Sequence, residues 1–281
     1  MRQLTIIGTG LIGGSFALAL KHHGFLGRIV GCDRPPVLAD AKARAAIDAG
    51  FDDPAQACAN SDVVVLATPV GPIMDLLERL GPLLPPDTLF TDVGSTKADV
   101  IARARDIFGD RVGERFLAGH PMAGKENSGI EQADANLFTG AVWLFTPLPG
   151  QDIRGGRLGE CVHWIERIGA RVLEMDVDRH DRICAWISHL PQMLSTALAA
   201  TLRDEFGNDP DLEAIGGRAL REMTRLAQSP YSMWRDIALT NTANIQEALL
   251  RLEQRLAHLR ENLRSRELEA EFDIARRFRK P

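Results

Sequence analysis

Short apolar runs alternate with segments of helical periodicity over the first part of the chain. Runs such as Val63-Val64-Val65-Leu66 suit strands that are buried on both faces, as in a parallel sheet covered by helices. Strands are predicted at 3–8, 28–32, 62–68, 88–91, 116–119, 142–146 and 171–175, with helices at 11–23, 37–49, 70–80, 96–108 and 155–168. This alternation predicts an α/β fold with a doubly wound, Rossmann-type sheet.

The pattern changes near residue 176. No strand is predicted beyond it, and Leu, Ala, Arg and Glu dominate helices expected at 178–206, 219–228 and 232–262. We therefore expect two domains, a nucleotide-binding domain at 1–176 and an all-helical domain at 177–281. The helices carry more apolar residues than an isolated bundle needs, which predicts a homodimer. The charged stretch 260–280 is expected to be a frayed helix or a tail crossing the partner subunit.

Composition narrows the class of protein. Hydrophobic residues make up 45% and charged residues 25%, as in ordinary globular proteins. The net charge of −5 argues against nucleic acid as a partner, since phosphate binding needs clustered basic charge. The four cysteines lack metal-like spacing, so we expect reduced thiols and no metal. No apolar run approaches ~20 residues, and no leader is recognisable. A cytoplasmic protein without a membrane segment is expected.

The segment Gly8-Thr9-Gly10-Leu11-Ile12-Gly13 is a dinucleotide fingerprint between a strand and a helix. Gly8 permits the tight turn, Gly10 lets the backbone approach a diphosphate, and Gly13 allows close packing of helix on strand. The diphosphate would lie at the positive N-terminus of the helix that begins with Leu11 and Ile12.

Asp33 ends the next strand and predicts NAD as the cofactor. Its carboxylate would accept hydrogen bonds from both ribose hydroxyls and repel a 2′-phosphate. Arg34 beside it would either bind such a phosphate or lie over the adenine. Thr68-Pro69 follows another strand, where it would contact the cofactor's ribose or diphosphate or simply form a turn into a helix.

Three further segments carry candidate chemistry. His120, in Gly-His-Pro-Met-Ala-Gly at 119–124, is a candidate proton acceptor. Ser95 follows a strand and lies at the ligand-binding edge of the sheet, where it would serve the site, cap a helix, or do both. His189 and Arg225 lie on predicted helices, and a core histidine and a surface arginine are the ordinary interpretations of such residues.

These motifs together resemble the prephenate/arogenate dehydrogenase family over essentially the whole chain. The matching segments are GTGLIGGS at 8–15, DVGSTK at 92–97, GHPMAG at 119–124, SHLPQ at 188–192 and TRLAQSPYSMWRDI at 224–237. The resemblance implies a nucleotide-binding domain followed by a helical dimerisation domain. It also implies that the substrate is surrounded by His120, Ser95, His189, Arg225 and Trp234.

The resemblance implies oxidative decarboxylation of prephenate to 4-hydroxyphenylpyruvate in tyrosine biosynthesis. His120 would accept the 4-hydroxyl proton, Ser95 would hold that hydroxyl and His120, and Arg225 would bind a carboxylate. His189 would bond the other polar end of the substrate, and Trp234 would form an apolar wall. Five other histidines are interpreted as surface or structural residues: His22, His23, His163, His180 and His258.

Substrate choice is predicted from charge. Lys125 would attract the pyruvyl carboxylate of prephenate and oppose the ammonium of arogenate, while Glu126 and Glu131 would counter it. Arg218 is expected to face solvent. Three alternatives are an arogenate or cyclohexadienyl dehydrogenase, a non-catalytic dinucleotide sensor, and a β-hydroxyacid dehydrogenase. The last would be expected to carry a catalytic lysine in 177–203, where none occurs. From the length of 281 residues we expect no fused chorismate mutase.

Overall fold

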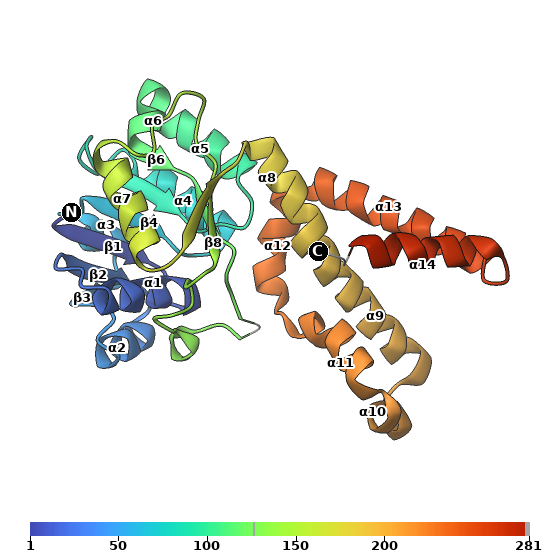
Figure 1. Ribbon diagram of the computed structural model, residues 1–281. Coiled ribbons are helices and arrows are strands. Elements are labelled where there is room, and N and C mark those ends of the chain that lie inside the picture. The colour runs from blue at the N-terminus through green and yellow to red at the C-terminus, as the bar shows by residue number, and fades with distance from the viewer. Residues whose placement is uncertain (126, 279–281) are drawn as a thin grey trace.

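The computed structural model describes residues 1–125 and 127–278. It contains an α/β unit and a helical unit, and α8 leads from the first into the second (Figure 1). The larger sheet is parallel throughout, in the order β3-β2-β1-β4-β5-β6. Its strands are β1 (Gln3–Ile7), β2 (Arg28–Cys32), β3 (Ala49–Phe51), β4 (Val63–Leu66), β5 (Leu89–Asp92) and β6 (Phe116–Leu117).

Helices cover both faces of this sheet, which confirms the doubly wound fold. Phe16 of α1 and Ile165 of α7 belong to one buried apolar cluster, while Ile73 of α4 and Ala104 of α5 belong to another. The helices of this unit are α1 (Leu11–His22), α2 (Pro35–Ala43), α3 (Pro54–Cys58), α4 (Val70–Leu80), α5 (Ala98–Phe108), α6 (Val112–Arg115) and α7 (Gly156–Arg167).

The last three strands form a separate sheet, and the single strand predicted at 116–119 is divided between the two sheets. In it β7 (Gly119–Pro121) pairs antiparallel with β8 (Val142–Phe145), which pairs parallel with β9 (Arg171–Glu174). The chain leaves the larger sheet after Leu117 and passes close to β5. A Cβ at Gly119 would lie 2.8 Å from the carbonyl oxygen of Asp92, so only glycine fits this approach.

The helix predicted at 37–49 was also too long. α2 ends at Ala43, and Ala45 has a positive φ of 55°, which is incompatible with a continuing helix. The chain then forms β3, whose three residues are too few for an alternating pattern to reveal. Asp53 caps the short α3 by accepting a hydrogen bond from the Gln56 N–H.

The second unit is entirely helical among the described residues, as predicted. The long helix expected at 178–206 contains a π-helical turn, Ala185–His189, just before Pro191, which has no N–H to donate. The helix expected at 232–262 is interrupted at Asn241. The elements are α8 (Val177–Cys184), α9 (Leu190–Phe206), α10 (Pro210–Ile215), α11 (Gly217–Thr224), the 3₁₀ turn η4 (Arg225–Gln228), α12 (Tyr231–Thr240), α13 (Thr242–Glu261) and α14 (Arg266–Phe278).

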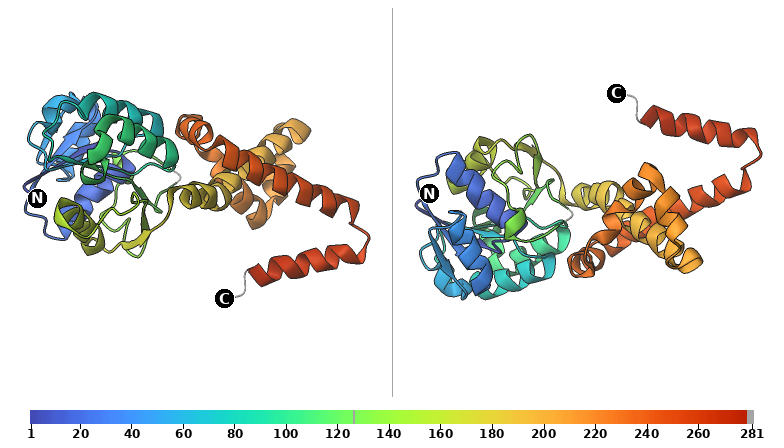
Figure 2. Two further views of the ribbon diagram at one scale, coloured as in Figure 1. Left: turned by 90° about the horizontal axis from the view of Figure 1, so that it is seen from above. Right: turned by 90° about the horizontal axis from the view of Figure 1, so that it is seen from below.

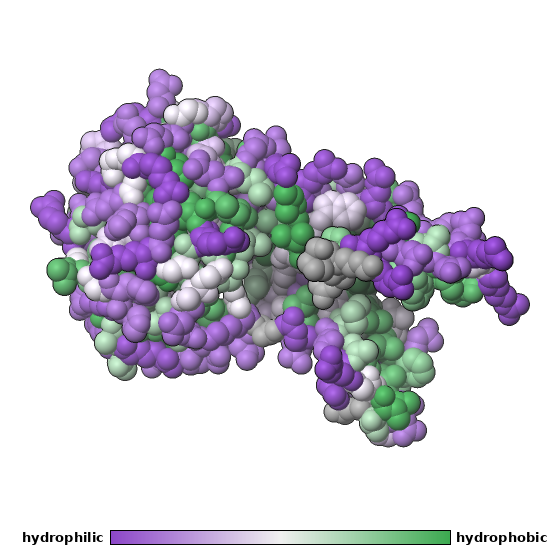
Figure 3. All heavy atoms as spheres, in the orientation of Figure 1, coloured by the Kyte–Doolittle hydropathy of each residue, from purple (hydrophilic) through white to green (hydrophobic). Residues whose placement is uncertain are grey.

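Helix α14 turns back at the end of α13 and diverges from it (Figure 2), and Arg255 of α13 forms an ion pair with Glu271 of α14. Its Phe272 and Phe278 are 65% and 87% exposed. Hydrophobic side chains also appear on the arm formed by α9, α10 and α11, whereas the visible face of the α/β unit is mostly hydrophilic (Figure 3). Within the described ranges, no helix combines the length and apolar character needed to cross a membrane.

Candidate active site

A cavity of about 280 Å³ opens at the carboxyl edge of the larger sheet. It lies where the strand order reverses between β1 and β4, the usual ligand position in doubly wound folds. Helix α12 of the second unit closes it with Met233 and Ile237. The predicted residues that line it are Gly10, Leu11, Ile12, Thr68, Pro69 and Ser95.

The fingerprint glycines have the geometry that a diphosphate requires. Gly8 has φ +92°, and a Cβ there would lie 2.5 Å from the carbonyl oxygen of Ala67. A Cβ at Gly13 would come 2.0 Å from the carbonyl oxygen of Gly8, so helix and strand can pack this closely only with glycine. Gly10, in contrast, faces open space at the N-terminus of α1. The loop therefore fits a dinucleotide diphosphate.

Asp33 lies beside this loop. Its Oδ2 accepts a hydrogen bond from the Thr9 N–H at 2.8 Å, and its Oδ1 accepts one from the Arg34 N–H at 2.8 Å. The carboxylate is half-buried, whereas Arg34 is exposed at the start of α2. Across the loop, the buried hydroxyl of Thr68 has no partner within the described residues, so it is available to a polar ligand.

The segment from Asp92 to Lys97 ties the cavity to the histidine motif. The side chains of Asp92 and Lys97, at the two ends of this segment, are fully buried and form an ion pair. Asp92 Oδ1 accepts a hydrogen bond from the Gly119 N–H at 3.1 Å, and Lys97 Nζ donates one to the Gly119 carbonyl at 2.7 Å. Ser95 lies between them, but α5 begins at Ala98 with Lys97 at the cap position. The expectation that Ser95 caps this helix was therefore wrong.

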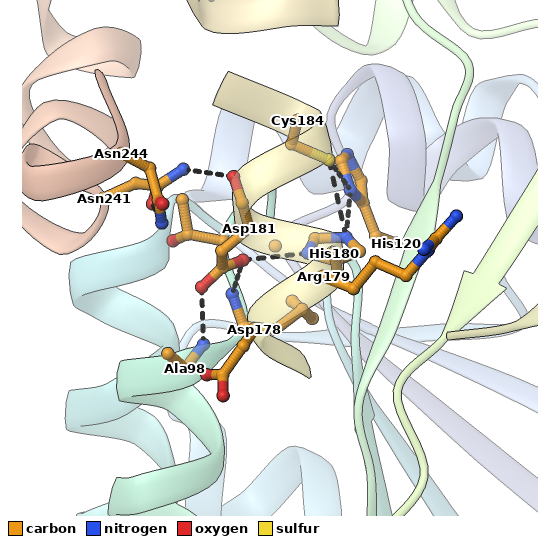
Figure 4. Close-up of polar contacts among 12 residues, drawn as sticks. Ala98, His120, Asp178, Arg179, His180, Asp181, Cys184, Asn241 and Asn244 are labelled. Carbon is orange, nitrogen blue, oxygen red and sulfur yellow. Dashed lines mark hydrogen bonds and ion pairs between the residues drawn. The ribbon is translucent and has the colours of Figure 1, made fainter. Parts of the chain in front are cut away.

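His120 follows Gly119 and contacts the second unit (Figure 4). Its Nδ1 lies 3.0 Å from Nε2 of His180, and Nδ1 of His180 lies 2.8 Å from Oδ1 of Asp181. His180 is fully buried. Of the two interpretations offered for His180, surface or structural, burial excludes the first, and α8 brings this side chain against the predicted proton acceptor, 60 positions away in the sequence.

Burial lowers the pKa of His120 well below 6.5, and electrostatic repulsion from the neighbouring His180, Lys97 and His189 acts in the same direction. The imidazole is thus neutral near physiological pH. Cys184 Sγ lies 3.9 Å from His120 Nδ1 and 3.7 Å from His180 Nε2. Burial raises the pKa of this thiol to about 12, so it stays protonated. The side-chain nitrogen and sulfur atoms that His120, His180 and Cys184 could offer to a metal ion lie within 4.8 Å of one another. No spacing motif in the sequence indicates this cluster.

His189 and Trp234 also come together. Their rings meet edge to face with centroids 5.9 Å apart, and both His189 Nε2 and Trp234 Nε1 are buried without a partner in the described part of the chain. His189 Nδ1 lies 3.2 Å from Nδ2 of Asn241. Burial lowers the pKa of His189 to about 4, so this ring is neutral as well. Within the described residues, two buried nitrogens are thus left for a polar ligand or a water molecule to bind.

Two sequence profiles match the chain. That of the prephenate dehydrogenase nucleotide-binding domain covers residues 16–174, and that of the prephenate dehydrogenase dimerisation domain covers 176–279. The chain belongs to the prephenate dehydrogenase family. Prephenate dehydrogenase of Lactococcus lactis subsp. cremoris is 32% identical over 265 residues, which are 93% of this chain and 70% of that protein.

Solved structures of this family agree with that assignment. Prephenate dehydrogenase from Aquifex aeolicus, in complex with hydroxyphenyl propionate and NAD⁺, is 34% identical. It superimposes with a TM-score of 0.87 over 99% of this chain and 95% of that one. Synechocystis arogenate dehydrogenase is 27% identical, with a TM-score of 0.78 over 99% of this chain and 98% of that one.

Two charged residues predicted to bind the substrate, Arg225 and Lys125, are exposed. Arg225 begins η4 and is exposed in the single chain. Lys125 donates a hydrogen bond to the carbonyl oxygen of Gln132 at 2.8 Å and lies 3.8 Å from the carboxylate of Asp134. Arg218 is 87% exposed and pairs with Glu222, in line with the prediction that it faces solvent. Glu126 lies outside the described residues.

Sequence reasoning missed the residues that support the motifs. Asp92 and Lys97 were inside a quoted motif, yet only Ser95 was singled out from it. His180 and Asp181 stand in an ordinary helical run, and no spacing signals their role. Asn241 gave no signal either, because polar residues are frequent around it in the helix predicted at 232–262.

Proposed function

We propose that this chain is an NAD-dependent dehydrogenase that converts prephenate to 4-hydroxyphenylpyruvate. The observation that carries the proposal is the placement of His120. It is neutral, one ring nitrogen faces His180, and Gly119 links it to the segment that brings Ser95 to the nucleotide cavity. A base beside a nicotinamide site suits the oxidation of an alcohol.

The chemistry of prephenate matches these residue types. Prephenate is a cyclohexadiene with a ring carboxylate, a pyruvyl side chain and a 4-hydroxyl. NAD, when bound, takes up the hydride from C4. His120 accepts the hydroxyl proton as the C4–oxygen bond becomes a carbonyl. When CO₂ leaves C1, its electron pair enters the ring and the oxygen regains a proton, giving an aromatic phenol.

The remaining residues would bind and orient the substrate. Ser95 would hold the 4-hydroxyl near His120. His189 Nε2 would satisfy its unmet hydrogen bond on a substrate oxygen, and the Trp234 ring would cover the apolar face. Arg225, permanently charged and planar, would bind a carboxylate in bidentate fashion.

Asp33 is expected to make NAD the preferred oxidant over NADP. Its carboxylate is already oriented by Thr9 and Arg34 backbone N–H groups. The Asp33→Ser variant should lower kcat/KM for NAD by roughly tenfold or more, since hydrogen bonds to a charged group are lost. The measurement compares both cofactors at limiting concentration. Faster turnover by the unmodified enzyme with NADP would contradict this assignment.

An arogenate or cyclohexadienyl dehydrogenase is the main alternative, and the likeness to the Synechocystis arogenate enzyme favours keeping it. We expect kcat/KM to favour prephenate at least tenfold, measured with both purified substrates side by side. Asp134 partly offsets the charge of Lys125, so Lys125→Ala should reduce the preference by up to about fivefold, the size of an exposed ion pair. A preference for arogenate would refute the substrate assignment, and an unchanged ratio would remove Lys125 from it.

A non-catalytic sensor is disfavoured by the same site. A protein that only binds a dinucleotide has no need for a buried neutral histidine in contact with the second unit, nor for unpaired buried nitrogens on His189 and Trp234 of that unit. Reduction of NAD by the purified protein with prephenate separates the two functions directly.

The cytoplasmic location and the domain boundary between residues 176 and 177 stay predictions.

A homodimer formed by the helical unit belongs to the proposal. The exposed apolar side chains of α13 and α14, such as Leu250 and Phe272, support it. Sedimentation at micromolar concentration should give twice the chain mass of 30.8 kDa. Phe272→Glu should shift the equilibrium toward monomer, whereas Leu26→Glu, at a residue 98% exposed on the other unit, should not. A stable monomer of the unmodified chain would contradict the dimer.

A further inference from the structure

Asp181 is a buried carboxylate where the two units meet, and the proposed chemistry makes no use of it. Its Oδ1 accepts hydrogen bonds from His180 Nδ1 and the Lys97 N–H, both at 2.8 Å, and its Oδ2 accepts one from the Ala98 N–H at 2.9 Å. Burial would raise the pKa of Asp181, but these hydrogen bonds outweigh it and lower that pKa. Asp181 is therefore ionised and can only accept hydrogen bonds.

Two branches of hydrogen bonds start at Asp181, the first through His180 to His120 and the second through Asn241 to His189. In the first branch, the Asp181 carboxylate determines where the protons lie. Because Asp181 cannot donate, the proton between them must be on His180 Nδ1. When this is the only proton on the fully buried His180 ring, its Nε2 is bare. That atom faces His120 Nδ1 at 3.0 Å, so His120 Nδ1 carries the proton that binds it. His120 is then left with a bare Nε2, the form that can accept a proton.

The backbone of Asp181 determines the second branch. Its carbonyl oxygen accepts a hydrogen bond from Asn241 Nδ2 at 2.8 Å, and Asn241 Oδ1 accepts one from Asn244 at 2.7 Å (Figure 4). These two contacts fix the amide orientation, because the carbonyl can only accept. Asn241 Nδ2 therefore also donates to His189 Nδ1 at 3.2 Å. Neutral His189 must carry its proton on Nε2, the buried atom that lacks a partner.

We propose that Asp181 is a positioning residue that fixes opposite tautomers in the two histidines. His120 presents a bare Nε2 and His189 presents an Nε2–H. The use of these atoms rests on the proposed function. His120 takes the hydroxyl proton, while His189 donates a hydrogen bond to an oxygen of the ring carboxylate or the keto-acid side chain. One residue thus prepares an acceptor and a donor for opposite ends of one substrate.

The reversed arrangement at His120 is unfavourable. With its proton on Nε2, the bare His120 Nδ1 would face the bare His180 Nε2 at 3.0 Å, and two lone pairs would repel each other. The Cys184 thiol could donate to only one of them, at 3.7 or 3.9 Å. The Cys184→Ala variant therefore tests whether this thiol affects the tautomers of the two histidines.

The tautomers can be measured directly in the unmodified enzyme. The protein is labelled with ¹⁵N-histidine, dialysed against a chelator to remove any metal, and examined by long-range ¹H–¹⁵N spectroscopy without substrate. His120→Asn and His189→Asn spectra assign the signals. We expect a protonated Nδ1 at His120 and a protonated Nε2 at His189. A protonated Nε2 at His120, or a protonated Nδ1 at His189, overturns the proposal.

Variants test the consequence of each branch. His180→Gln retains an acceptor opposite His120 while its amide can still donate to Asp181, whereas His180→Phe has similar bulk and no acceptor. His180→Phe should lower kcat at least about tenfold with little change in KM, and His180→Gln should restore most of it. Cys184→Ala should keep both the tautomers and kcat. Equal kcat values for His180→Phe and the unmodified enzyme would refute the first branch.

Asn241→Asp tests the second branch. A carboxylate there accepts from His189 Nδ1 and moves the proton away from Nε2, so KM should rise while kcat changes less. An unchanged KM would refute the donor role of His189. Because the spectra need no turnover, failure of the tautomer assignment is distinguishable from failure of the substrate assignment.

Discussion

Replacing His120 with Asn is expected to lower kcat by roughly 10²-fold or more, the usual contribution of a general base. The amide keeps a polar group at the position but cannot take up the hydroxyl proton. Affinity for NAD should change much less, because the fingerprint loop follows β1 of the larger sheet, whereas His120 lies in β7 of the smaller sheet. Steady-state kinetics together with a binding titration for NAD separate the two quantities.

His163→Asn, an exposed histidine on α7, is the matched control and should leave kcat unchanged. A His120→Asn variant with near-normal kcat would remove His120 from the mechanism. The pH profile offers a second check. The groups around His120 are Lys97, His180, Cys184 and His189, and burial is the largest cause of its lowered pKa. The base should therefore stay neutral, and activity persist, well below pH 6.5. Activity is lost only as the pH falls through that lowered pKa.

Arg225→Ala is expected to raise KM for prephenate by roughly 10- to 100-fold, because a charge-assisted hydrogen bond contributes about 1.5–3 kcal/mol. Arg225→Lys should restore only part of this loss, since an ammonium group cannot bind a carboxylate in the planar, bidentate manner of a guanidinium. kcat should change less than KM if the interaction is similar in ground and transition states.

The control for this series is Arg218→Ala. Arg218 lies on the preceding helix, is 87% exposed and pairs with Glu222, so its removal should leave KM unchanged. Equal KM values for Arg225→Ala and the unmodified enzyme would assign Arg225 a structural role. A parallel rise in Arg218→Ala would mean that general positive charge, not a specific contact, attracts the substrate.

Local patterns in the sequence predicted most of the fold. Continuous apolar runs indicated buried parallel strands, and Gly8, Gly10 and Gly13 identified the loop after β1 because diphosphate geometry is demanding at each position. Errors arose where a partner far along the chain decided the outcome. The patterns of β7, β8 and β9 did not reveal that these strands form a separate sheet, because strand patterns do not specify which neighbour each strand pairs with.

The sequence by itself determined a Rossmann-type unit, a helical second unit, and the motifs that carry His120, Ser95, His189 and Arg225. Only the tertiary structure decided how the two histidines are supported. His180 and Asp181 lie in an ordinary amphipathic helix, and they matter because α8 packs against the loop before α5 and against Gly119–Pro121. A ring's proton is placed by the group that faces it in space. For His120 that group comes from 60 positions away, where no local pattern can record it.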